Sequence, residues 1–531
     1  MKIAAVLFLL LAVMAFEAAG AEGLSDRPMK EIDAGEILEK IQEGQPVEYD
    51  HVVVRGDLDL SRGRLQKNVT SPIRINDSIF KGLVSFNGST IEMPIDVSGS
   101  NFSRKASFML ATFSDTVHLR KATFSNDANF LGATFNSYAE FMNSTFISEA
   151  NFLGTTFRGE AYFMNSTFRS EAQFLYAIFS GNADFKEATF RGKAGFFGTT
   201  LSSYAGFEKA TFIGESCFME ATFLDNAYFW DAIFGGDANF MDATLRSKAY
   251  FYGTTFREET YFDGATFSGG ADFSGASLFG NSSFDDAEFD GNIEFGDARF
   301  ENETSFYRIL FKRPAYFENC SIKSLNLIKA EYNRLHLRWG DIKSLHFDDA
   351  TYLALIKNYN TLGWYGDAND CYYDYRNAVR RSWQAPSSGF AARLSSLLDR
   401  LVDFGEWILY GYGVRPSFPI AWSVLIILAF GLFFRQKRCL RKIITEEKIE
   451  DAGDGSDEVL VESKARKAPI NSLDPFLFSL FTFTSGFTAF LQPAVEYKLE
   501  RCLRWAIAER LLGPFFLALV ITTISKTYLI R

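Results

Sequence analysis

Residues 150–168 read ANFLGTTFRGEAYFMNSTF. Within this stretch, rings recur in steps of five, six and five residues, at Phe152, Phe157, Phe163 and Phe168. The same alternation runs from Phe124 to Phe306, with Leu in place of Phe at positions 201, 245 and 278. A small residue, usually Ala, Ser or Thr, precedes each ring by two positions. The repeat unit is therefore eleven residues long, A-x-F-x-x-A-T-F-x-x-x.

This spacing excludes a long α-helix. Eleven residues complete three helical turns, but rings five and six residues apart would lie on different sides of a helix. In an extended chain, residues i and i−2 point the same way, so each small residue and its ring can both face inward. The Gly, Ser, Asn and Asp residues between rings favour turns. The pattern predicts a four-sided coil of 22 residues, two eleven-residue units per turn.

The repeats from Phe102 to Phe306 resemble the pentapeptide-repeat family. Chains of that family form a right-handed quadrilateral β-helix with Phe or Leu at the central position and Ala two positions before it. The resemblance implies a β-solenoid of about nine coils, roughly 45 Å long, with coils about 4.8 Å apart. The extra residue in alternate units is expected as a bulge at two of the four corners. The rings are predicted to pack in the core and to bind no ligand.

Outward positions of the predicted coil carry charged residues, Asn and tyrosines. The tyrosines include Tyr162, Tyr228, Tyr250 and Tyr261. A solvated face and a binding strip are the two interpretations of this pattern. Cys217 comes directly before Phe218 and is also expected to point outward.

The first 21 residues have the pattern of a secretory signal. Lys2 is followed by an apolar run over residues 3–16 and by Ala19-Gly20-Ala21, a small-x-small cleavage site. An uncleaved anchor is the alternative, although the run is short for a membrane span. The signal predicts an extracytoplasmic repeat domain. Eight Asn-x-Ser/Thr sequons are candidate glycosylation acceptors there: Asn68, Asn76, Asn87, Asn101, Asn143, Asn165, Asn281 and Asn302.

Composition and motifs argue against catalysis and against nucleic-acid binding. The net charge is −11, whereas phosphate neutralisation needs clustered Lys and Arg. The five cysteines are too sparse for a disulfide framework or a zinc site, and the four histidines lack metal-ligand spacing. The sequence contains neither a GxSxG nucleophile motif nor a phosphate-binding loop motif. We therefore expect a non-enzymatic protein without cofactor or metal.

Short helical segments flank the predicted rod. Residues 34–44 have the apolar spacing of an amphipathic helix, which would cover the open end of the coil stack. Residues 352–383 resemble the helical hairpin that follows the repeats in membrane-linked members of the family. Three aspartates in it, Asp367, Asp370 and Asp374, are interpreted as a capped helix start rather than as a metal cluster.

Three apolar stretches near the C-terminus, residues 418–434, 475–493 and 511–524, are candidate membrane spans. The basic run Arg435–Lys442 follows the first stretch, and the positive-inside rule places that side in the cytoplasm. The charged residues 443–470 are predicted to form a mobile cytoplasmic linker. We expect three spans. Two spans with a re-entrant loop between them are the alternative.

The C-terminal region also resembles the two-helix pore module of potassium channels. The resemblance lies in LYGYGVRPS (409–417), FSLFTFTSGF (478–487) and LLGPFFLALVITTIS (511–525). In that family the filter reads T-x-T-T-V-G-Y-G-D, and its carbonyls replace the hydration shell of the ion. The pore-like residues here are Thr482, Thr484, Ser485, Gly486 and Phe487. Since one residue, the second Gly and the Asp are missing, a selective potassium filter is not expected.

These observations define the predicted domain organisation. The segments are a signal peptide (1–21), an N-terminal capping helix and strand (22–60), the repeat β-helix (61–317), a helical hairpin with juxtamembrane region (318–404), a first span with its basic flank (405–442), a charged linker (443–470) and a degenerate pore-like module with two hydrophobic segments (471–531).

Two functions fit this organisation. The first is a multi-pass cell-membrane protein whose extracytoplasmic repeats act as a structural, adhesive or interaction scaffold. The second is a channel-like protein with a regulatory repeat domain. Membrane lipids and a cell-envelope or protein partner are the expected partners, and homo-oligomerisation is left open. Mimicry of duplex DNA, known for soluble members of the family, conflicts with the signal and the spans.

Overall fold

The computed structural model describes residues 29–61, 68–382, 390–449, 461–485, 496–499 and 501–529. The predicted signal peptide lies outside these residues. The chain forms two compact units, Met1–His346 and Phe347–Arg531.

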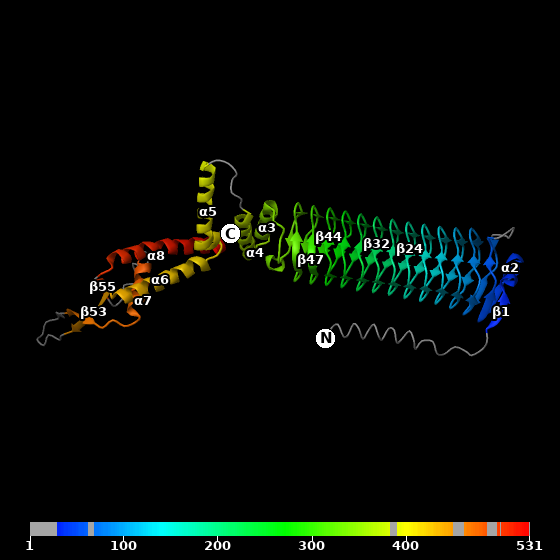
Figure 1. The fold of residues 1–531 in the computed structure, drawn as a ribbon, viewed down its shortest axis with the longest axis horizontal. Coiled ribbons are helices and arrows are strands. Elements are labelled where there is room, and N and C mark those ends of the chain that lie inside the picture. The colour runs from blue at the N-terminus through cyan, green and yellow to red at the C-terminus, as the bar shows by residue number, and fades with distance from the viewer. Residues whose placement is uncertain are drawn as a thin grey trace, which may run out of the picture. The chain divides into compact units, whose positions relative to one another are not determined.

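The first unit is a β-solenoid built from very short strands, which confirms the predicted fold (Figure 1). One coil runs through β20 (Ala150–Asn151), β21 (Thr156–Phe157), β22 (Ala161–Tyr162) and β23 (Thr167–Phe168). Each strand pairs in parallel with the strand one coil later, so that Ala150 lies opposite Ala172 and Phe157 opposite Phe179. The coil therefore repeats every 22 residues, as the spacing of the rings predicts.

The solenoid is longer than the predicted nine coils. The sheet that runs from β2 (Val47–Asp50) to β52 (Leu335–His336) has 14 strands, one per coil. At about 4.8 Å per coil, this makes the stack roughly 60 Å long. The spacing of the Phe rings does not reveal the additional coils, because Val, Ile and Leu replace Phe at their inward positions. Val54, Ile75 and Leu325 are examples, and all three are buried. The predicted limits of the repeat domain, 61–317, are therefore too narrow.

The core consists of columns of phenylalanine rings. Phe152 stacks on Phe130 and Phe174 with ring centroids 4.8 and 4.7 Å apart and with nearly parallel planes. It also meets Phe141 and Phe163 of the facing column edge-on, at 5.5 and 5.4 Å. Rings thus use both of the geometries that aromatic pairs prefer, parallel stacking along a column and edge-to-face contact between columns. All five rings are fully buried.

The residue two positions before a ring also faces the interior, and in most coils it is small. Ala150 and Ala161 have no exposed surface. A hydroxyl residue at this place can bond to a backbone carbonyl: Thr155 Oγ1 donates to the Phe130 carbonyl at 2.8 Å and Ser144 Oγ to that of Leu119 at 2.9 Å. These two hydrogen bonds remove most of the cost of burying the two hydroxyls.

The corners alternate between two types. A tight corner such as Leu131–Gly132 has its second residue in the left-handed region (φ 60° at Gly132), and such residues recur at the same corners of successive coils, for instance at Asn143 and Asn165. The extra residue of the six-residue step lies in the other corner type, as in residues 125–127 between β15 (Thr123–Phe124) and β16 (Ala128–Asn129). The predicted bulge is wrong: neighbouring coils carry the same extra residue, so none is left unopposed in the ladder.

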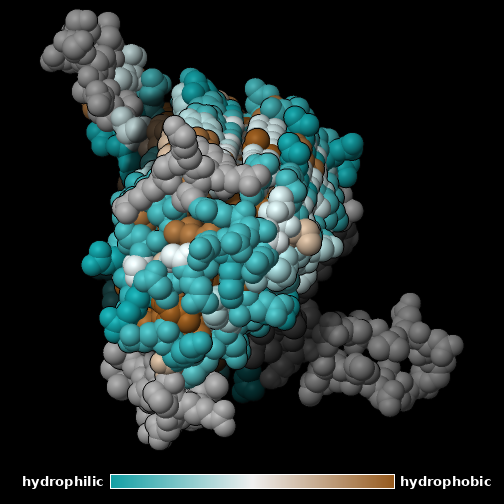
Figure 2. All heavy atoms as spheres, turned by 90° about the vertical axis from the view of Figure 1, so that its right-hand side faces the viewer, coloured by the Kyte–Doolittle hydropathy of each residue, from teal (hydrophilic) through white to brown (hydrophobic). Residues whose placement is uncertain are grey.

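The predicted N-terminal helix is present as α2 (Ala34–Gln42) and lies at one end of the coil stack (Figure 1). Asp33 caps it by accepting a hydrogen bond from the Gly35 amide at 2.8 Å. Ile37 and Ile41 are buried and Glu36 and Lys40 face outward. Figure 2 looks onto this end and shows a largely hydrophilic surface, so the helix covers apolar coil residues that would otherwise be open to pairing.

The second unit is mainly helical. Its helices are α3 (Asp349–Thr361), α4 (Tyr365–Ser382), α5 (Phe390–Tyr410), α6 (Ser417–Lys437), α7 (Asp474–Thr484) and α8 (Leu503–Ile524). Helices α3 and α4 form the predicted hairpin, with Gly363 (φ 74°) in the turn. A three-stranded sheet follows α6 and consists of β53 (Leu440–Ile449), β54 (Val461–Ala468) and β55 (Glu496–Leu499).

One expectation for this unit is corrected, and the described residues cover a second one only in part. Residues 443–449 and 461–468 of the predicted mobile linker are strands of an antiparallel pair, because strand pairing is non-local and charge composition does not report it. Within the predicted span 475–493, the structure has the 11-residue helix α7, and residues 486–495 lie outside the described part. At 1.5 Å per residue, α7 is too short to cross a bilayer.

Two described helices are long and apolar enough to cross a membrane, α6 and the segment Leu503–Thr527 that begins with α8. This assignment rests on length and composition alone. The two helices pack side by side with α7 against them (Figure 1).

The ring columns predict the effect of a single truncation. Phe152→Ala removes a ring that six others contact, and large-to-small core changes of this kind cost about 3–5 kcal/mol. Hydrogen–deuterium exchange should show faster exchange in the coils on either side of residue 152. Arg169→Ala, at an exposed outward position, is the matched control and should leave exchange unchanged. Equal exchange in the two variants would contradict the packed-column description.

Candidate functional site

An aromatic cluster lies on the outer face of the sheet that runs from β2 to β52. Tyr228 on β34 (Ala227–Tyr228) and Tyr250 on β38 (Ala249–Tyr250) stack at 5.1 Å with an interplanar angle of 5°. Trp230 meets both rings edge-on, at 5.5 and 5.8 Å, and Tyr204 packs on Tyr228 at 5.1 Å. Trp230 is 43% exposed and Tyr252, one coil further, is 54% exposed. The rings are thus ordered by each other and still open to solvent.

Two adjoining hollows follow the aromatic cluster along the same face. The first, about 350 Å³, is lined by Lys248, Tyr250, Gly270, Asp272 and Glu294, among others. The second, about 320 Å³, is lined by Ser274, Glu294, Gly296, Tyr316 and Glu318. The repeat explains them: the positions of Trp230 and Tyr252 are taken in the next two coils by Ser274 and Gly296. The rings of Trp230 and Tyr252 therefore lie next to a depression where the equivalent positions are the small residues Ser274 and Gly296.

The depression is acidic. Asp272, Glu294 and Glu318 border the two hollows, whereas Lys248 is the single cation among the residues that line them. Asp272 accepts a hydrogen bond from the Ser274 amide at 2.9 Å. Exposed Trp and Tyr are enriched in protein–protein interfaces.

Other charges on this sheet neutralise one another. Arg120 donates to both carboxylate oxygens of Glu140 at 2.7 Å, and His118 also contacts this carboxylate. Burial raises the pKa of Glu140, but the hydrogen bonds from Arg120 and His118 outweigh it and lower the pKa overall. This buried carboxylate is already paired, which indicates a structural role for it.

The predicted outward residues are where the coil pattern places them. Tyr162, Tyr228, Tyr250, Tyr261 and Cys217 are all partly exposed. Among the sequon asparagines, Asn68, Asn143, Asn165 and Asn281 are exposed. The other four are partly buried or bonded in the ladder, namely Asn76, Asn87, Asn101 and Asn302. Glycosylation stays a prediction, and exposure favours the first group.

The second unit contains a disulfide that the sequence argument missed. Cys439, two residues after α6, is bonded to Cys502, directly before α8, with their Cα atoms 6.0 Å apart. The five cysteines are too sparse in the sequence for a disulfide framework, but the packing of α6 on α8 brings these two together. The bond joins the ends of both candidate spans, beside a small core that includes Phe434, Leu440 and Ala506.

A buried carboxylate fixes the start of α7 at the same end. Asp474 accepts hydrogen bonds from Lys442 of β53 at 3.0 Å, from Tyr497 of β55 at 2.9 Å and from the Asn471 amide at 2.6 Å. At the middle of α7, Ser479 Oγ bonds to the Ile427 carbonyl of α6 at 2.8 Å and contacts the buried Glu509 of α8. Polar contacts therefore hold α7 to both long helices.

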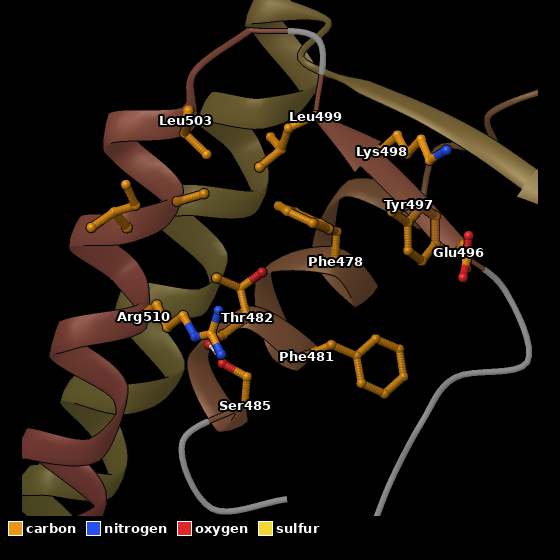
Figure 3. A pocket seen from close by; sticks show the side chains of 12 residues that line it. Phe478, Phe481, Thr482, Ser485, Glu496, Tyr497, Lys498, Leu499, Leu503 and Arg510 are labelled. Atoms are coloured by element: carbon orange, nitrogen blue, oxygen red, sulfur yellow. Dashed lines mark hydrogen bonds between the residues drawn. The ribbon is translucent and has the colours of Figure 1, made fainter. Parts of the chain in front are cut away.

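The pore-like residues are only partly described. Thr482 and Thr484 lie on α7 and Ser485 caps it, whereas Gly486 and Phe487 lie outside the described residues. Thr482 and Ser485 face a cavity of about 670 Å³ that is also lined by Arg510 of α8 and Tyr497 of β55 (Figure 3). The Ser485 hydroxyl donates to the Thr482 carbonyl at 2.8 Å. Because Thr482 and Thr484 are helical, they do not form an extended filter strand in this chain.

In the described part of the chain, no group of three His, Cys, Asp or Glu side chains is placed to hold a metal ion. Two of the three aspartates of α4 have contacts or positions typical of a structural role. Asp367 lies in the first turn of the helix, and Asp370 pairs with Arg415 of the same unit.

A family model described as Pentapeptide repeats (9 copies) matches residues 108–156, 152–200, 229–277 and 251–299. Neither a curated protein nor a solved structure matches the chain. The matched residues all lie in the solenoid, and the pore-like module has no family match. The coils within residues 108–200 and 229–299 therefore match pentapeptide repeats.

Close packing of α7 on α8 generates a testable consequence. A Cβ on Gly513 would lie 1.8 Å from the Phe483 carbonyl oxygen, so Gly513→Ala forces the helices apart. Overpacking of this kind costs about 1–3 kcal/mol, and the melting temperature of the detergent-solubilised protein should fall. Gly405→Ala is the control, because open space surrounds that position in α5, and it should be neutral or stabilising. An equal effect of both changes would contradict the packing.

Proposed function

We propose that the protein is a membrane-anchored, non-enzymatic interaction scaffold. Its repeat rod presents the aromatic cluster and the acidic hollows to a partner, and α6 and α8 hold the rod at the membrane. The exposed but mutually ordered rings of Trp230, Tyr228 and Tyr250 carry this proposal. A rigid repeat surface suits this role, because its side chains are positioned before binding and little conformational entropy is lost.

In this proposal the rod is extracytoplasmic. The secretory pattern of residues 1–21 and the basic run Arg435–Lys442 after α6 both support that orientation. The rod and the basic run lie on opposite sides of α6 along the chain. Export would therefore place the rod outside and the basic run inside.

The helical unit supports a second candidate, a channel-like module with a cytoplasmic rod. The short helix α7 between two spans is typical of a re-entrant pore segment. The Cys439–Cys502 disulfide favours an oxidising compartment at the end of α6 that is farther from the rod along the chain. The two candidates thus require opposite orientations.

Labelling of Cys217 in intact cells separates the two orientations. Cys217 is partly exposed, whereas Cys320 and Cys371 are buried. The scaffold proposal predicts that a membrane-impermeant maleimide labels the protein before lysis, and that Cys217→Ser abolishes this labelling. If labelling requires lysis, the rod is cytoplasmic and the channel-like candidate gains support.

A photo-crosslinking residue at position 230 tests the partner-binding face. The proposal predicts a discrete crosslinked product in intact cells from position 230, and its loss on Tyr252→Ser. Tyr176, which is 56% exposed and lies outside the aromatic cluster, is the matched control position. The same products from positions 230 and 176 would show that the cluster has no preferred partner.

A further inference from the structure

Helix α5 carries an apolar stripe along its described length. Its members are Leu394, Leu397, Leu398, Leu401, Val402, Phe404, Ile408 and Leu409. At 100° per residue these side chains occupy an arc of about 160°, with only Gly405 among them. Leu394, Leu397, Leu398 and Leu401 are 48–67% exposed. Soluble proteins seldom leave so continuous an apolar face open, so the stripe marks a binding surface.

The opposite face of α5 packs against α4. Arg376 of α4 pairs with Asp403 at 2.9 Å and with Glu406 at 3.1 Å. The Trp407 indole donates to the Tyr373 hydroxyl at 3.1 Å, and Arg380 lies over the Trp407 ring at 3.9 Å. These contacts fix the rotation of α5 about its axis. The apolar stripe therefore points away from α4.

The stripe is continuous with the apolar surface of α6. The Trp422 indole of α6 donates to the Ile408 carbonyl at 2.8 Å and joins the two helices where they meet. In the angle between them lies a hollow of about 260 Å³ lined by Ile408, Phe418, Ala421, Trp422 and Leu425. Further along α6, Val424 and Leu428 are about half exposed. The apolar surface is thus continuous from α5 to the candidate span α6.

The directions of the helices fit a membrane surface. In Figure 1, α5 runs crosswise to α6 and α8, which run alongside one another. A helix that lies across the direction of a span runs along the plane of the bilayer. Trp422 lies where α5 and α6 meet, and Trp prefers the membrane interface.

We infer that α5 binds the lipid surface, with its leucine stripe in the boundary between headgroups and acyl chains. This inference rests on the proposed membrane anchoring and adds a second, lateral attachment to it. The polar face, with Asp399 and Asp403, stays on the water side together with α4. Interfacial helices of this type bury their apolar face about 5–10 Å deep.

Spin-label accessibility in the full-length protein tests the inference. Nitroxides are placed singly at Leu397 on the stripe, at Asp399 on the polar face and at Val424 in α6, in a Cys217→Ser background. All three sites are exposed, so the labels leave the core intact. The protein is reconstituted in phosphatidylcholine–phosphatidylglycerol vesicles. Collisions with a nickel complex should be about five-fold rarer at 397 than at 399, with frequent oxygen collisions at 397.

The other outcomes are distinct. Equal nickel collisions at 397 and 399, with Val424 in lipid, would overturn the inference and leave the anchor intact. Shielding of 397 from both nickel and oxygen would overturn it in favour of a protein contact, such as a second copy of the chain. Frequent nickel collisions at Val424 would instead contradict the membrane anchoring on which the inference rests.

Discussion

Stacking of identical coils is the constraint on which the first unit depends. Parallel ladders fix neighbouring coils one strand spacing apart, and that spacing is also a good stacking distance for phenyl rings, as in the pair Phe152 and Phe174 at 4.7 Å. The distance between paired strands and the distance between stacked rings therefore favour the same spacing between coils. Each coil must place a ring and a small residue at the same points of the turn, which leaves the outward positions free to vary. The aromatic cluster and the hollows beside it arise from that freedom.

The helical unit has no such repeat, and its organisation depends on a few specific contacts. The disulfide Cys439–Cys502, the Asp474 network and the close approach at Gly513 hold α6, α7 and α8 together. Arg376 binds α5 to α4, so the leucine stripe is turned outward.

The sequence was sufficient where the physics is periodic. The alternating five- and six-residue spacing of the Phe residues predicts the four-sided coil, its 22-residue period and the outward position of Tyr228 and Tyr250. It failed at the ends of the solenoid, where aliphatic residues such as Val54 and Leu325 take the inward positions and break the ring signal. The pairing of Cys439 with Cys502 and the β53–β54 strands escaped because each joins segments that are distant in sequence. Gly270, Ser274 and Gly296 could have indicated the hollows, since they interrupt rows of large side chains that the repeat defines.

A cryo-microscopy map of the full-length protein in lipid nanodiscs tests the central claim most directly. The account predicts a four-sided tube of 14 coils whose interior is filled, with stacked ring density in the central coils and aliphatic side chains at the ends, followed by two helices within the disc. A tube with a hollow interior, or helical density between residues 124 and 306, would contradict it.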